Sequence, residues 1–159
     1  MAGILFTDET LVLAGYNEFH EHVTGFGGKK KNAEYPYETA IREVVEELLE
    51  IHSINEAIYK EICEQITFDN VISYKAYSMY IMSFRDLEHV LFVVRRYGYK
   101  SKLYDSFPRT VSDLIFKRKK ANNCEFDSLV VLPMNHNYHL KPEFLKDMIT
   151  FKNISLINR

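Results

Sequence analysis

Acidic side chains crowd one side of a predicted helix over residues 37–51. With 100° of rotation per residue, its glutamates fall within an arc of about 100°, and apolar residues cover the opposite side. Like charges one turn apart destabilise a helix, which a divalent cation would offset because Mg²⁺ and Mn²⁺ prefer hard oxygen ligands. Mg²⁺ also leaves some of its coordination positions to water and substrate phosphate. This acidic flank therefore predicts phosphoanhydride cleavage. The glutamates are Glu43, Glu46, Glu47 and Glu50.

A run of charges more often marks a solvated helix face, but the spacing upstream of this one favours a site. From Gly28 to Glu47 the chain reads G-x5-E-x7-R-E-U-x-E-E, where U is apolar. This pattern resembles the Nudix box. The family continues with a glycine where this chain has Leu49. Because a glycine there would cap the helix, its loss predicts a further helical turn before His52 and Ser53.

The resemblance implies an α/β fold, namely a Nudix-type α/β/α sandwich with a mixed β-sheet. It also implies hydrolysis of a nucleoside diphosphate linked to another group, with Mg²⁺ or Mn²⁺ as cofactor to offset phosphate charge and lower the pKa of a bound water. By the same resemblance, Arg42 pairs with Glu34 and, together with Gly28, forms the structural part of the motif. The implied metal ligands are the Gly27 carbonyl and the side chains of Glu43, Glu46 and Glu47.

A glutamate must also remove a proton from the attacking water. Glu43 is one candidate. Several Nudix branches recruit an acidic residue from outside the box, and Glu125 is the leading candidate of that kind here, ahead of Asp127 and Glu88. The predicted catalytic set is therefore Glu43, Glu46, Glu47 and Glu125.

Positive charge gathers in two segments. Lys29, Lys30 and Lys31 follow the glycine-rich turn and are predicted to bind substrate phosphates, with solvated surface lysines as the alternative. Residues 85–120 hold ten Lys or Arg against four acidic residues, a net charge of +6, whereas the remainder of the chain carries −8. We interpret residues 85–123 as a basic, helical insertion that either shields the core or attracts RNA, with tyrosines able to stack on bases.

Apolar patterns predict the elements that must position these residues. A hairpin is expected from Ala2–Phe6 and Leu11–Ala14, and a strand over Val23–Phe26 leads into the glycine-rich turn. Further strands are predicted at Ala57–Phe68, Ala76–Phe84 and within Cys124–Pro133, and further helices at Val90–Tyr99, Thr110–Lys120 and Pro142–Ile149.

The composition suits a single domain spanning residues 1–159. A hydrophobic content of 47% allows a sizeable core, and the length is small for two domains. Cys63 and Cys124 show no metal-ligand spacing and are interpreted as reduced thiols. The N-terminus lacks the basic start of a signal peptide, and no apolar run reaches membrane-spanning length. We therefore expect a cytoplasmic protein without a membrane partner.

The sequence constrains the substrate less than the reaction. The run from Gly25 to Lys29 is similar to that of oxidised-purine nucleoside triphosphatases, which favours a small nucleotide. The lysine triplet and the basic segment resemble decapping Nudix enzymes, which makes capped mRNA the leading special case. Dinucleoside polyphosphates, ADP-ribose and inositol pyrophosphates are alternatives. A non-catalytic module that senses a nucleotide is another, although such modules usually lose box glutamates that this chain keeps.

Overall fold

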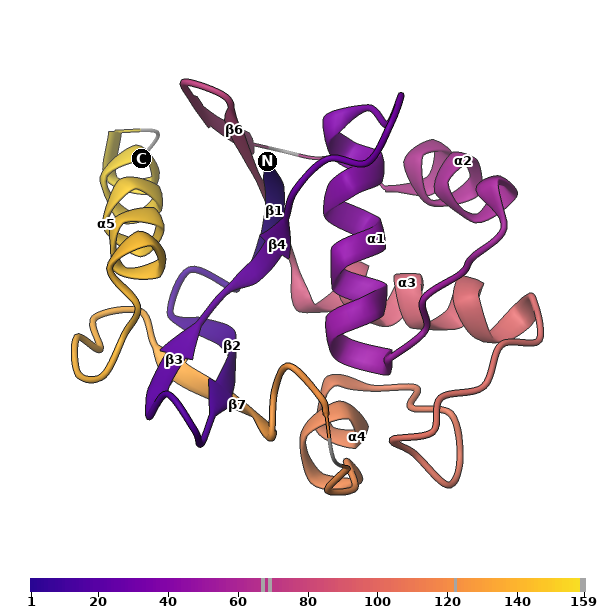
Figure 1. Cartoon of the computed structure of the whole chain (residues 1–159). Helices are drawn as coiled ribbons and strands as arrows, with labels where there is room; N and C mark the ends of the chain where they lie inside the picture. The colour runs from indigo at the N-terminus through magenta and orange to yellow at the C-terminus, as the bar shows by residue number, and fades with distance from the viewer. Residues whose placement is uncertain (67, 69, 122, 158–159) are drawn as a thin grey trace.

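The computed structural model describes residues 1–66, 68, 70–121 and 123–157. Within these ranges, seven strands form two sheets and five helices pack around them (Figure 1). The strands are β1 (Ala2–Phe6), β2 (Leu11–Asn17), β3 (His22–Thr24), β4 (Phe26–Gly28), β5 (Asn70–Tyr74), β6 (Tyr77–Met82) and β7 (Ser128–Pro133). The helices are α1 (Pro36–Leu49), α2 (Glu56–Gln65), α3 (Phe84–Arg96), α4 (Val111–Phe116) and α5 (Pro142–Ile157).

The larger sheet has the strand order β4-β1-β6-β5 and is mixed, because β1 runs parallel to β6 and antiparallel to β4. The smaller sheet, β3-β2-β7, is antiparallel. The predicted hairpin is therefore wrong in part. Thr7 and Val12 form a bridge beside the turn, but β1 and β2 then separate into different sheets, because β4 and β6 already occupy both edges of β1.

Two hydrophobic clusters lie on the two faces of the larger sheet. Ile4 and Phe6 of β1 pack with residues of α1, α2 and α3, whereas the intervening Leu5 packs with residues of α5. This division follows from the alternation of side chains along a strand. Figure 1 shows α1 on one side of the sheet and α5 on the other. The fold is thus mixed α/β, with helices on both faces of a mixed sheet.

Helix α1 begins and ends at defined caps. Pro36 occupies its first turn, and the N–H of Tyr35 donates to Oε2 of Glu38 at 2.9 Å. The predicted extra turn at the other end is wrong. Glu50 adopts a left-handed conformation (φ 52°), and its N–H closes the helix on the carbonyl of Glu46 at 2.8 Å. Glu50 thus provides the cap that a glycine would otherwise supply.

The strand predicted over Ala57–Phe68 is wrong, because most of this segment forms helix α2. Its buried residues Ile58 and Ile62 lie four positions apart, a spacing that places two side chains on one face of a helix as well as of a strand. Asn55 favours the helix, since its side chain accepts an N–H of the first turn at 2.9 Å. Thr67 lies outside the described residues.

The segment predicted as an insertion, residues 85–123, contributes helix α3 to the core. This helix begins earlier than predicted, directly after the capping residue Ser83. Helix α4 is shorter than the helix predicted over Thr110–Lys120, and Asn122 lies outside the described residues. The interpretation of this segment as one that shields the core is therefore wrong for α3, which is itself part of the core. Its buried side chains are Leu87, Val90, Leu91, Val93 and Val94.

Other predicted elements agree with the structure more closely. Strands β6 and β7 lie within the predicted ranges Ala76–Phe84 and Cys124–Pro133, and α5 extends the helix predicted over Pro142–Ile149. The strand predicted over Val23–Phe26 is split between β3 and β4 at Gly25, where a Cβ atom would lie 2.8 Å from the Phe144 ring. In the part of the chain that the structure describes, no helix combines the length and apolar character needed to cross a membrane.

Candidate functional site

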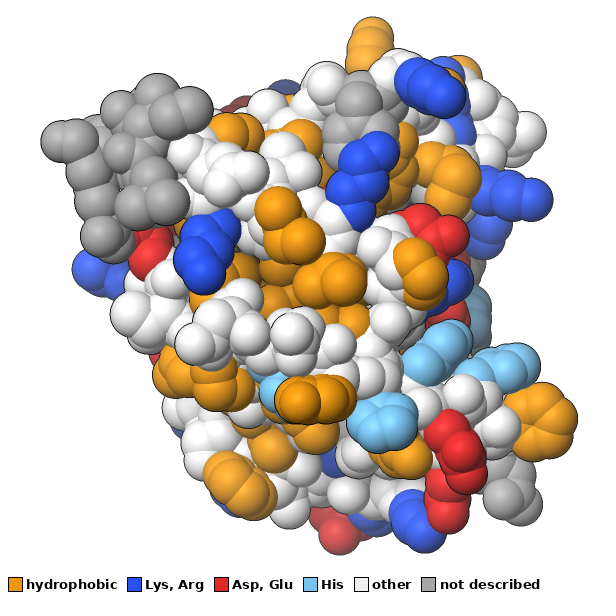
Figure 2. All heavy atoms as spheres, turned by 90° about the vertical axis from the view of Figure 1, so that its left-hand side faces the viewer, with side chains coloured by type: hydrophobic (Ala, Val, Ile, Leu, Met, Phe, Trp, Pro, Cys, Tyr) orange, Lys and Arg blue, Asp and Glu red, His pale blue; other side chains and the backbone are white. Residues whose placement is uncertain are grey.

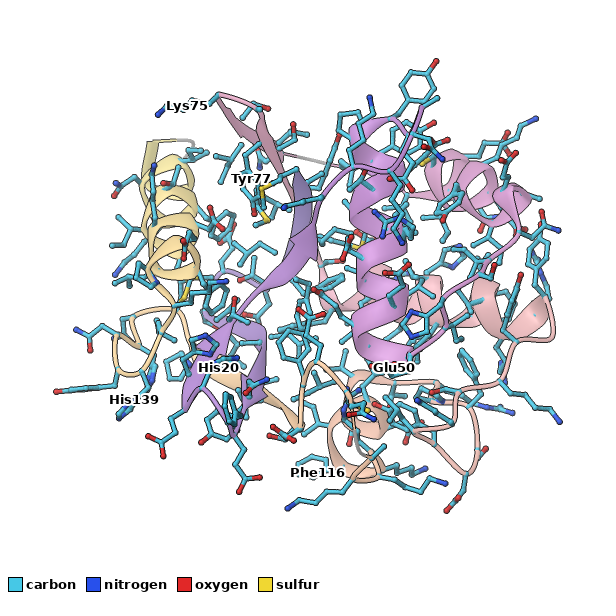
Figure 3. The ribbon with its side chains drawn as sticks, in the orientation of Figure 1. His20, Glu50, Lys75, Tyr77, Phe116 and His139 are labelled. Atoms are coloured by element: carbon cyan, nitrogen blue, oxygen red, sulfur yellow. The ribbon has the colours of Figure 1, made fainter. Side chains whose placement is uncertain are left out.

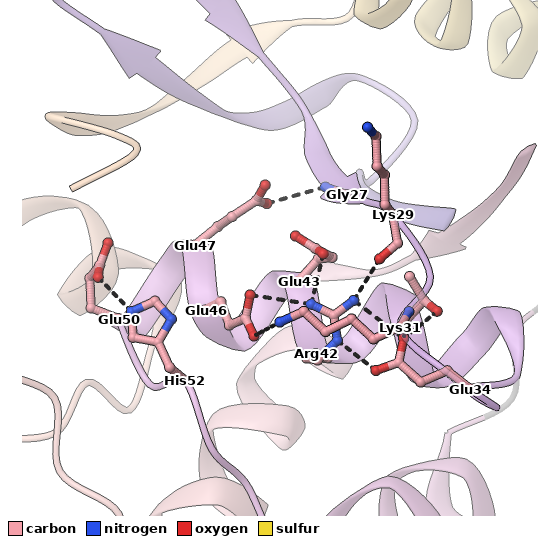
Figure 4. Close-up of polar contacts among 11 residues, drawn as sticks. Gly27, Lys29, Lys31, Glu34, Arg42, Glu43, Glu46, Glu47, Glu50 and His52 are labelled. Atoms are coloured by element: carbon pink, nitrogen blue, oxygen red, sulfur yellow. Dashed lines mark hydrogen bonds and ion pairs between the residues drawn. The ribbon is translucent and has the colours of Figure 1, made fainter. Parts of the chain in front are cut away.

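Helix α1 presents most of its glutamates toward the edge strand β4 (Figure 4). Glu47 is 3% exposed, and the side chains of Glu43 and Glu46 are each 15% exposed. Glu50 lies apart from them, with its carboxylate 2.9 Å from Nε2 of His52. The acidic flank predicted from the sequence is therefore narrower than expected, and Glu50 is a helix cap rather than a member of the site.

The carboxyl group of Glu47 is buried between β4 and the loop that precedes β7. The N–H of Gly27 donates to its Oε2 at 3.2 Å, and it shares a side-chain hydrogen bond with Glu125. Burial, followed by the negative charges of Glu125 and Glu43, raises the pKa of Glu47 to about 10. Burial and the charge of Glu43 also raise the pKa of Glu125. The structure thus brings Glu125 from a distant part of the chain to the helix glutamates, and its catalytic role stays a prediction.

The guanidinium of Arg42 links three carboxylates. Its Nε donates to Oε1 of Glu34 at 2.6 Å, and its Nη1 donates to Glu43 at 2.7 Å and to Glu46 at 3.2 Å. Its Nη2 donates to the carbonyl of Lys29 at 2.8 Å. Because Arg42 is 7% exposed, these charge-assisted bonds are shielded from water and fix the direction of each side chain. The ion pair between Arg42 and Glu34 is the one implied by the sequence motif.

Glu34 anchors this network from the loop before α1. Burial alone would raise its pKa, but hydrogen bonds from Arg42, the Lys31 N–H and the Thr39 hydroxyl lower it to about 2. The N–H of Lys31 and the hydroxyl of Thr39 lie 3.0 Å and 2.8 Å from its Oε2. Glu34 is therefore ionised at neutral pH, and its contacts position Arg42.

Gly28 on β4 leaves the space that the Glu43 side chain occupies. A Cβ atom added to Gly28 would lie 2.3 Å from Cδ of Glu43 and 2.5 Å from each of its carboxylate oxygens. Carbon atoms that are not bonded to one another do not approach this closely, since packed atoms prefer separations of roughly 3.5–4.0 Å. The motif therefore needs a residue without a side chain at this position for steric reasons.

The three lysines predicted to bind phosphate lie beside the acidic network. Nζ of Lys31 is 3.4 Å from Oε1 of Glu46. Lys29 and Lys30 are exposed, and Figure 4 shows the Lys29 side chain extending away from Arg42. Lys31 therefore offsets part of the acidic charge, and all three lysines stay predicted substrate contacts.

The carboxylate oxygens of this site are ligands of the kind that a hard divalent cation prefers. The glutamate side chains would have to rotate to hold such a cation. Among the residues that the structure describes, no three His, Cys, Asp or Glu side chains form a group that could hold a metal ion. Arg42 holds two of the glutamates, while Glu47 is turned toward β4. A cation beside Glu47 would favour its ionised form, and Mg²⁺ and Mn²⁺ prefer carboxylate oxygens. The predicted ligand set stays a prediction: Gly27, Glu43, Glu46 and Glu47.

Arg118, predicted as part of a substrate-attracting basic run, instead holds the end of α1. Its Nη1 donates to the carbonyl of Leu48 at 2.7 Å. Its Nη2 donates to the carbonyls of Glu47 at 3.3 Å and Phe126 at 3.2 Å. The last carbonyls of a helix lack partners within it, and a cation is favoured there. Because Phe126 follows Glu125, one guanidinium holds the backbone beside both members of the carboxyl pair.

The other acidic candidates outside the helix bind backbone groups. Oδ2 of Asp127 accepts the N–H of Glu18 at 2.6 Å, and Oε2 of Glu88 accepts the N–H of Val111 at 3.0 Å. Both carboxylates therefore join segments that lie far apart in the sequence. Of the three candidates from outside the helix, Glu125 is the one that the structure places against Glu47.

Ion pairs engage part of the basic segment, residues 85–120. Lys117 pairs with Asp113 and Lys119 pairs with Asp105, each at 2.9 Å. The lysine side chains remain 66% and 47% exposed, so a polyanion could compete for them at little cost. These pairs reduce the local positive charge without burying it.

Neither the family models nor the curated proteins compared with this chain match it. The spacing of the motif and the contacts of the site are therefore the features that bear on function, because a fold of this general class hosts many activities.

Proposed function

We propose that the protein is a Mg²⁺- or Mn²⁺-dependent Nudix hydrolase that cleaves a phosphoanhydride bond in a nucleoside diphosphate linked to another group. The observation that carries this proposal is the pair of carboxyl groups of Glu47 and Glu125, which share a hydrogen bond beside β4 while the negative charge of Glu43 acts on both. Charging three carboxyl groups in a poorly exposed site is costly, and a divalent cation with a bound phosphate would balance them. Helices on both faces of a mixed sheet support the same proposal.

The residues of the site have different roles in this reaction. A bound Mg²⁺ or Mn²⁺ supplies charge stabilisation at the phosphoryl oxygens and lowers the pKa of water. The Gly27 carbonyl, Glu43, Glu46 and Glu47 would hold it. Arg42 keeps two of these glutamates on the same side of α1. The exposed lysines of the preceding loop bind phosphate oxygens of the substrate.

Glu125 is the better-placed proton acceptor of the two candidates. Glu43 already accepts a hydrogen bond from Nη1 of Arg42 at 2.7 Å, and this bond fixes the direction of its side chain. Glu125 comes from outside the helix and has its hydrogen bond with Glu47. Once Glu47 is ionised, it no longer donates this hydrogen bond. The Glu125 carboxylate can then accept the proton of the attacking water at one of its oxygens.

The decisive test replaces Glu47 by Gln, which keeps the shape of the side chain but cannot become a carboxylate. Hydrolysis of nucleoside diphosphate derivatives with Mn²⁺ is expected to fall at least about 100-fold. Glu56→Gln is the control, because it changes the same residue type at an exposed position of α2 outside the site, and its activity should stay within about threefold of wild type. Equal activity of both variants would contradict the proposal.

Binding of Mn²⁺ gives a readout that does not depend on turnover. Mn²⁺ should raise the melting temperature of the wild type and of Glu56→Gln, and it should raise that of Glu47→Gln much less. A wild-type protein that is stabilised by nucleotide but hydrolyses none of a broad substrate panel would favour the non-catalytic sensing module.

Capped mRNA is the leading special case within this proposal. It is supported by the net charge of +6 on residues 85–120 and by the exposure of Lys117 and Lys119. Small nucleotides, including oxidised nucleoside triphosphates, dinucleoside polyphosphates and ADP-ribose, are the alternative. They need only the acidic site and a pocket for one nucleoside.

A further inference from the structure

A cavity of about 400 Å³ lies at the end of α3, within the basic segment. This volume falls within the range of roughly 300–1,000 Å³ that is typical of small-molecule sites. The residues that line it lie between Arg95 and Phe107, in the last turn of α3 and the loop that follows. One continuous stretch of chain therefore builds the cavity.

Two hydrogen bonds fix the loop that forms this cavity. The buried hydroxyl of Ser101 donates to the carbonyl of Leu49, at the end of α1, at 2.6 Å. The hydroxyl of Tyr99 accepts the N–H of Asn55, the capping residue of α2, at 2.8 Å. Figure 3 shows Glu50 at the lower end of α1, and the cavity lies next to this end. Because contacts with two other helices hold the loop, the cavity is formed before a ligand binds.

The cavity carries positive charge that acidic side chains do not offset. Among the described residues, neither Arg95 nor Lys100 forms an ion pair, and both line the cavity. Asp105 also lines it, but Lys119 pairs with this carboxylate at 2.9 Å. The α5 side of the molecule differs, since Figure 2 shows hydrophobic and uncharged side chains across its middle, with Lys and Arg mostly toward the edges of the view. The cavity at the end of α3 therefore suits an anionic ligand.

Arg95 contacts one exposed aromatic ring and lines a cavity that includes others. Its guanidinium lies 5.7 Å from the centre of the Phe92 ring, which is 44% exposed. Tyr99 and Phe107 line the cavity and pack against the hydrophobic core, which holds their rings in place. The same cation thus serves two neighbouring places where a flat group could stack.

This combination of cations and rings suits a strand of nucleotides. Each nucleotide brings an anionic phosphate and a flat base that can stack on an aromatic ring or on a guanidinium. A single nucleotide would use only one of the two stacking places. An acidic peptide would meet the cations but would leave the rings without partners. Bases in a duplex are already stacked on one another, so the ligand that fits is single-stranded.

We propose that Phe92, Arg95 and the cavity bind consecutive nucleotides of a single-stranded RNA. Arg95 and Lys100 contact the phosphates, and the aromatic rings stack on the bases. As a substrate site, this surface rests on the proposed function, because it makes the nucleoside diphosphate the end of an RNA strand rather than a small nucleotide.

The test measures binding of a short labelled RNA by fluorescence anisotropy. The RNA has a 5′-hydroxyl end and no phosphoanhydride bond, and EDTA removes divalent cations, so the proposed reaction cannot consume it. The wild type is expected to bind this RNA at least about tenfold more tightly than an abasic strand with the same number of phosphates. Equal affinities would show that the surface binds any polyanion and would overturn the proposal. Tighter binding of a DNA strand of the same sequence would overturn the choice of RNA.

A double variant locates the phosphate contacts. Arg95→Gln combined with Lys100→Gln should weaken RNA binding at least about tenfold and make it less dependent on salt, by about 0.7 in slope for each lost contact. The matched control combines Arg85→Gln with Lys75→Gln, which removes the same residue types at exposed positions outside the cavity lining. Figure 3 shows Lys75 far from Glu50. The control should bind RNA within about threefold of wild type, and equal losses in both double variants would overturn the proposal.

Phe92→Leu separates stacking from charge. This variant removes an exposed ring and keeps every cation, so it should bind RNA at least about threefold more weakly and the abasic strand equally well. Phe116→Leu is the matched control, because Phe116 is an exposed phenylalanine of α4 that does not line the cavity, and it should bind both strands as the wild type does. An equal loss for both strands in Phe92→Leu would overturn the stacking role.

Binding and hydrolysis separate this proposal from the proposed function. RNA binding that depends on Arg95 and Lys100, without hydrolysis of any nucleotide derivative, would support this surface and contradict the hydrolase. Hydrolysis that depends on Glu47, without tighter binding of RNA than of the abasic strand, would support the hydrolase and overturn the RNA surface.

Discussion

Gly28 shows how one missing side chain shapes the site. In Gly28→Ala, the new Cβ atom would displace the Glu43 carboxylate, because it would otherwise lie 2.3 Å from Cδ. The proposed hydrolysis is expected to fall at least about tenfold, since a carboxylate of the proposed metal site would be moved by about 1 Å. Steady-state kinetics with Mn²⁺ measures this change.

Gly98→Ala is the control for that substitution. A Cβ atom at Gly98 meets nothing within 4 Å, although its φ of +87° strains any side chain there. This variant should lose stability but keep the activity of its folded fraction. If both glycine variants lose activity in proportion to their stability, the steric role of Gly28 in the site is wrong.

Glu34 predicts a pH dependence of stability. Its pKa is about 2 in the folded protein, below the ordinary value of 4.5, so the unfolded chain binds the proton more readily. The resulting stabilisation is present above pH 4.5 and is lost as pH falls toward 2. Its size is of order 1–2 kcal/mol, because partial exposure screens the ion pair.

Urea unfolding from pH 7 to pH 3 checks this contribution. Glu34→Gln should be less stable than wild type at pH 7, and the difference should shrink as the pH falls below 4.5. A difference that stays constant over this range would show that the Glu34 carboxylate does not contribute through its charge. Glu143→Gln, an exposed substitution, should differ little from wild type at any pH.

At the scale of elements, the end of α1 depends on a residue from a different segment. Arg118 holds the carbonyls of Glu47, Leu48 and Phe126, and so it sets the distance between the two carboxyl groups beside them. Arg118→Ala should lower kcat about tenfold with a smaller change in KM, because the variant misplaces catalytic groups more than it changes substrate binding. Arg118→Lys should recover part of the loss, since it restores a donor but not the fork of the guanidinium.

Lys117→Ala is the control for Arg118, because Lys117 is the adjacent, exposed residue paired with Asp113. Its kcat should stay within about threefold of wild type. Two results together would contradict a positioning role. Arg118→Lys would recover none of the kcat lost in Arg118→Ala, and Lys117→Ala would lose as much kcat as Arg118→Ala.

The sequence predicts some of these elements and not others for physical reasons. The spacing of Glu43, Glu46 and Glu47 placed them on one face of α1, and the structure agrees. Helix α2 was not predictable from its apolar positions, because a spacing of four residues fits a helix and a strand equally. The role of Arg118 was hidden in a run of four basic residues, where composition does not distinguish a partly buried guanidinium from solvated neighbours.

At the scale of the whole molecule, the positive charge gathered in residues 85–120 provides a test that distinguishes two substrate classes. Changing Lys117, Lys119 and Lys120 to Gln removes three exposed charges and leaves Arg118 on the end of α1. If capped RNA is the substrate, its cleavage should fall severalfold and depend less steeply on salt, by about 0.7 per lost phosphate contact for a single strand. Hydrolysis of a small nucleotide by the same variant is the internal control and should not change.

Equal rates of RNA cleavage in wild type and the triple variant would show that the basic segment does not bind substrate. The small-nucleotide alternative would then be favoured. The coarse fold class, mixed α/β with a mixed sheet, agrees with the sequence analysis at this scale. The division of β1 and β2 between two sheets was not predictable, because it depends on which strands occupy the edges of β1.

The contact between Arg118 and Leu48 joins residues 70 positions apart in the chain. During synthesis, α1 therefore emerges long before the group that completes its last turn. Amide hydrogens in that turn should exchange with solvent until the later segment has docked, and they should become protected together with β7 rather than with the start of the helix. The order in which protection appears during refolding would show whether the candidate site is completed late.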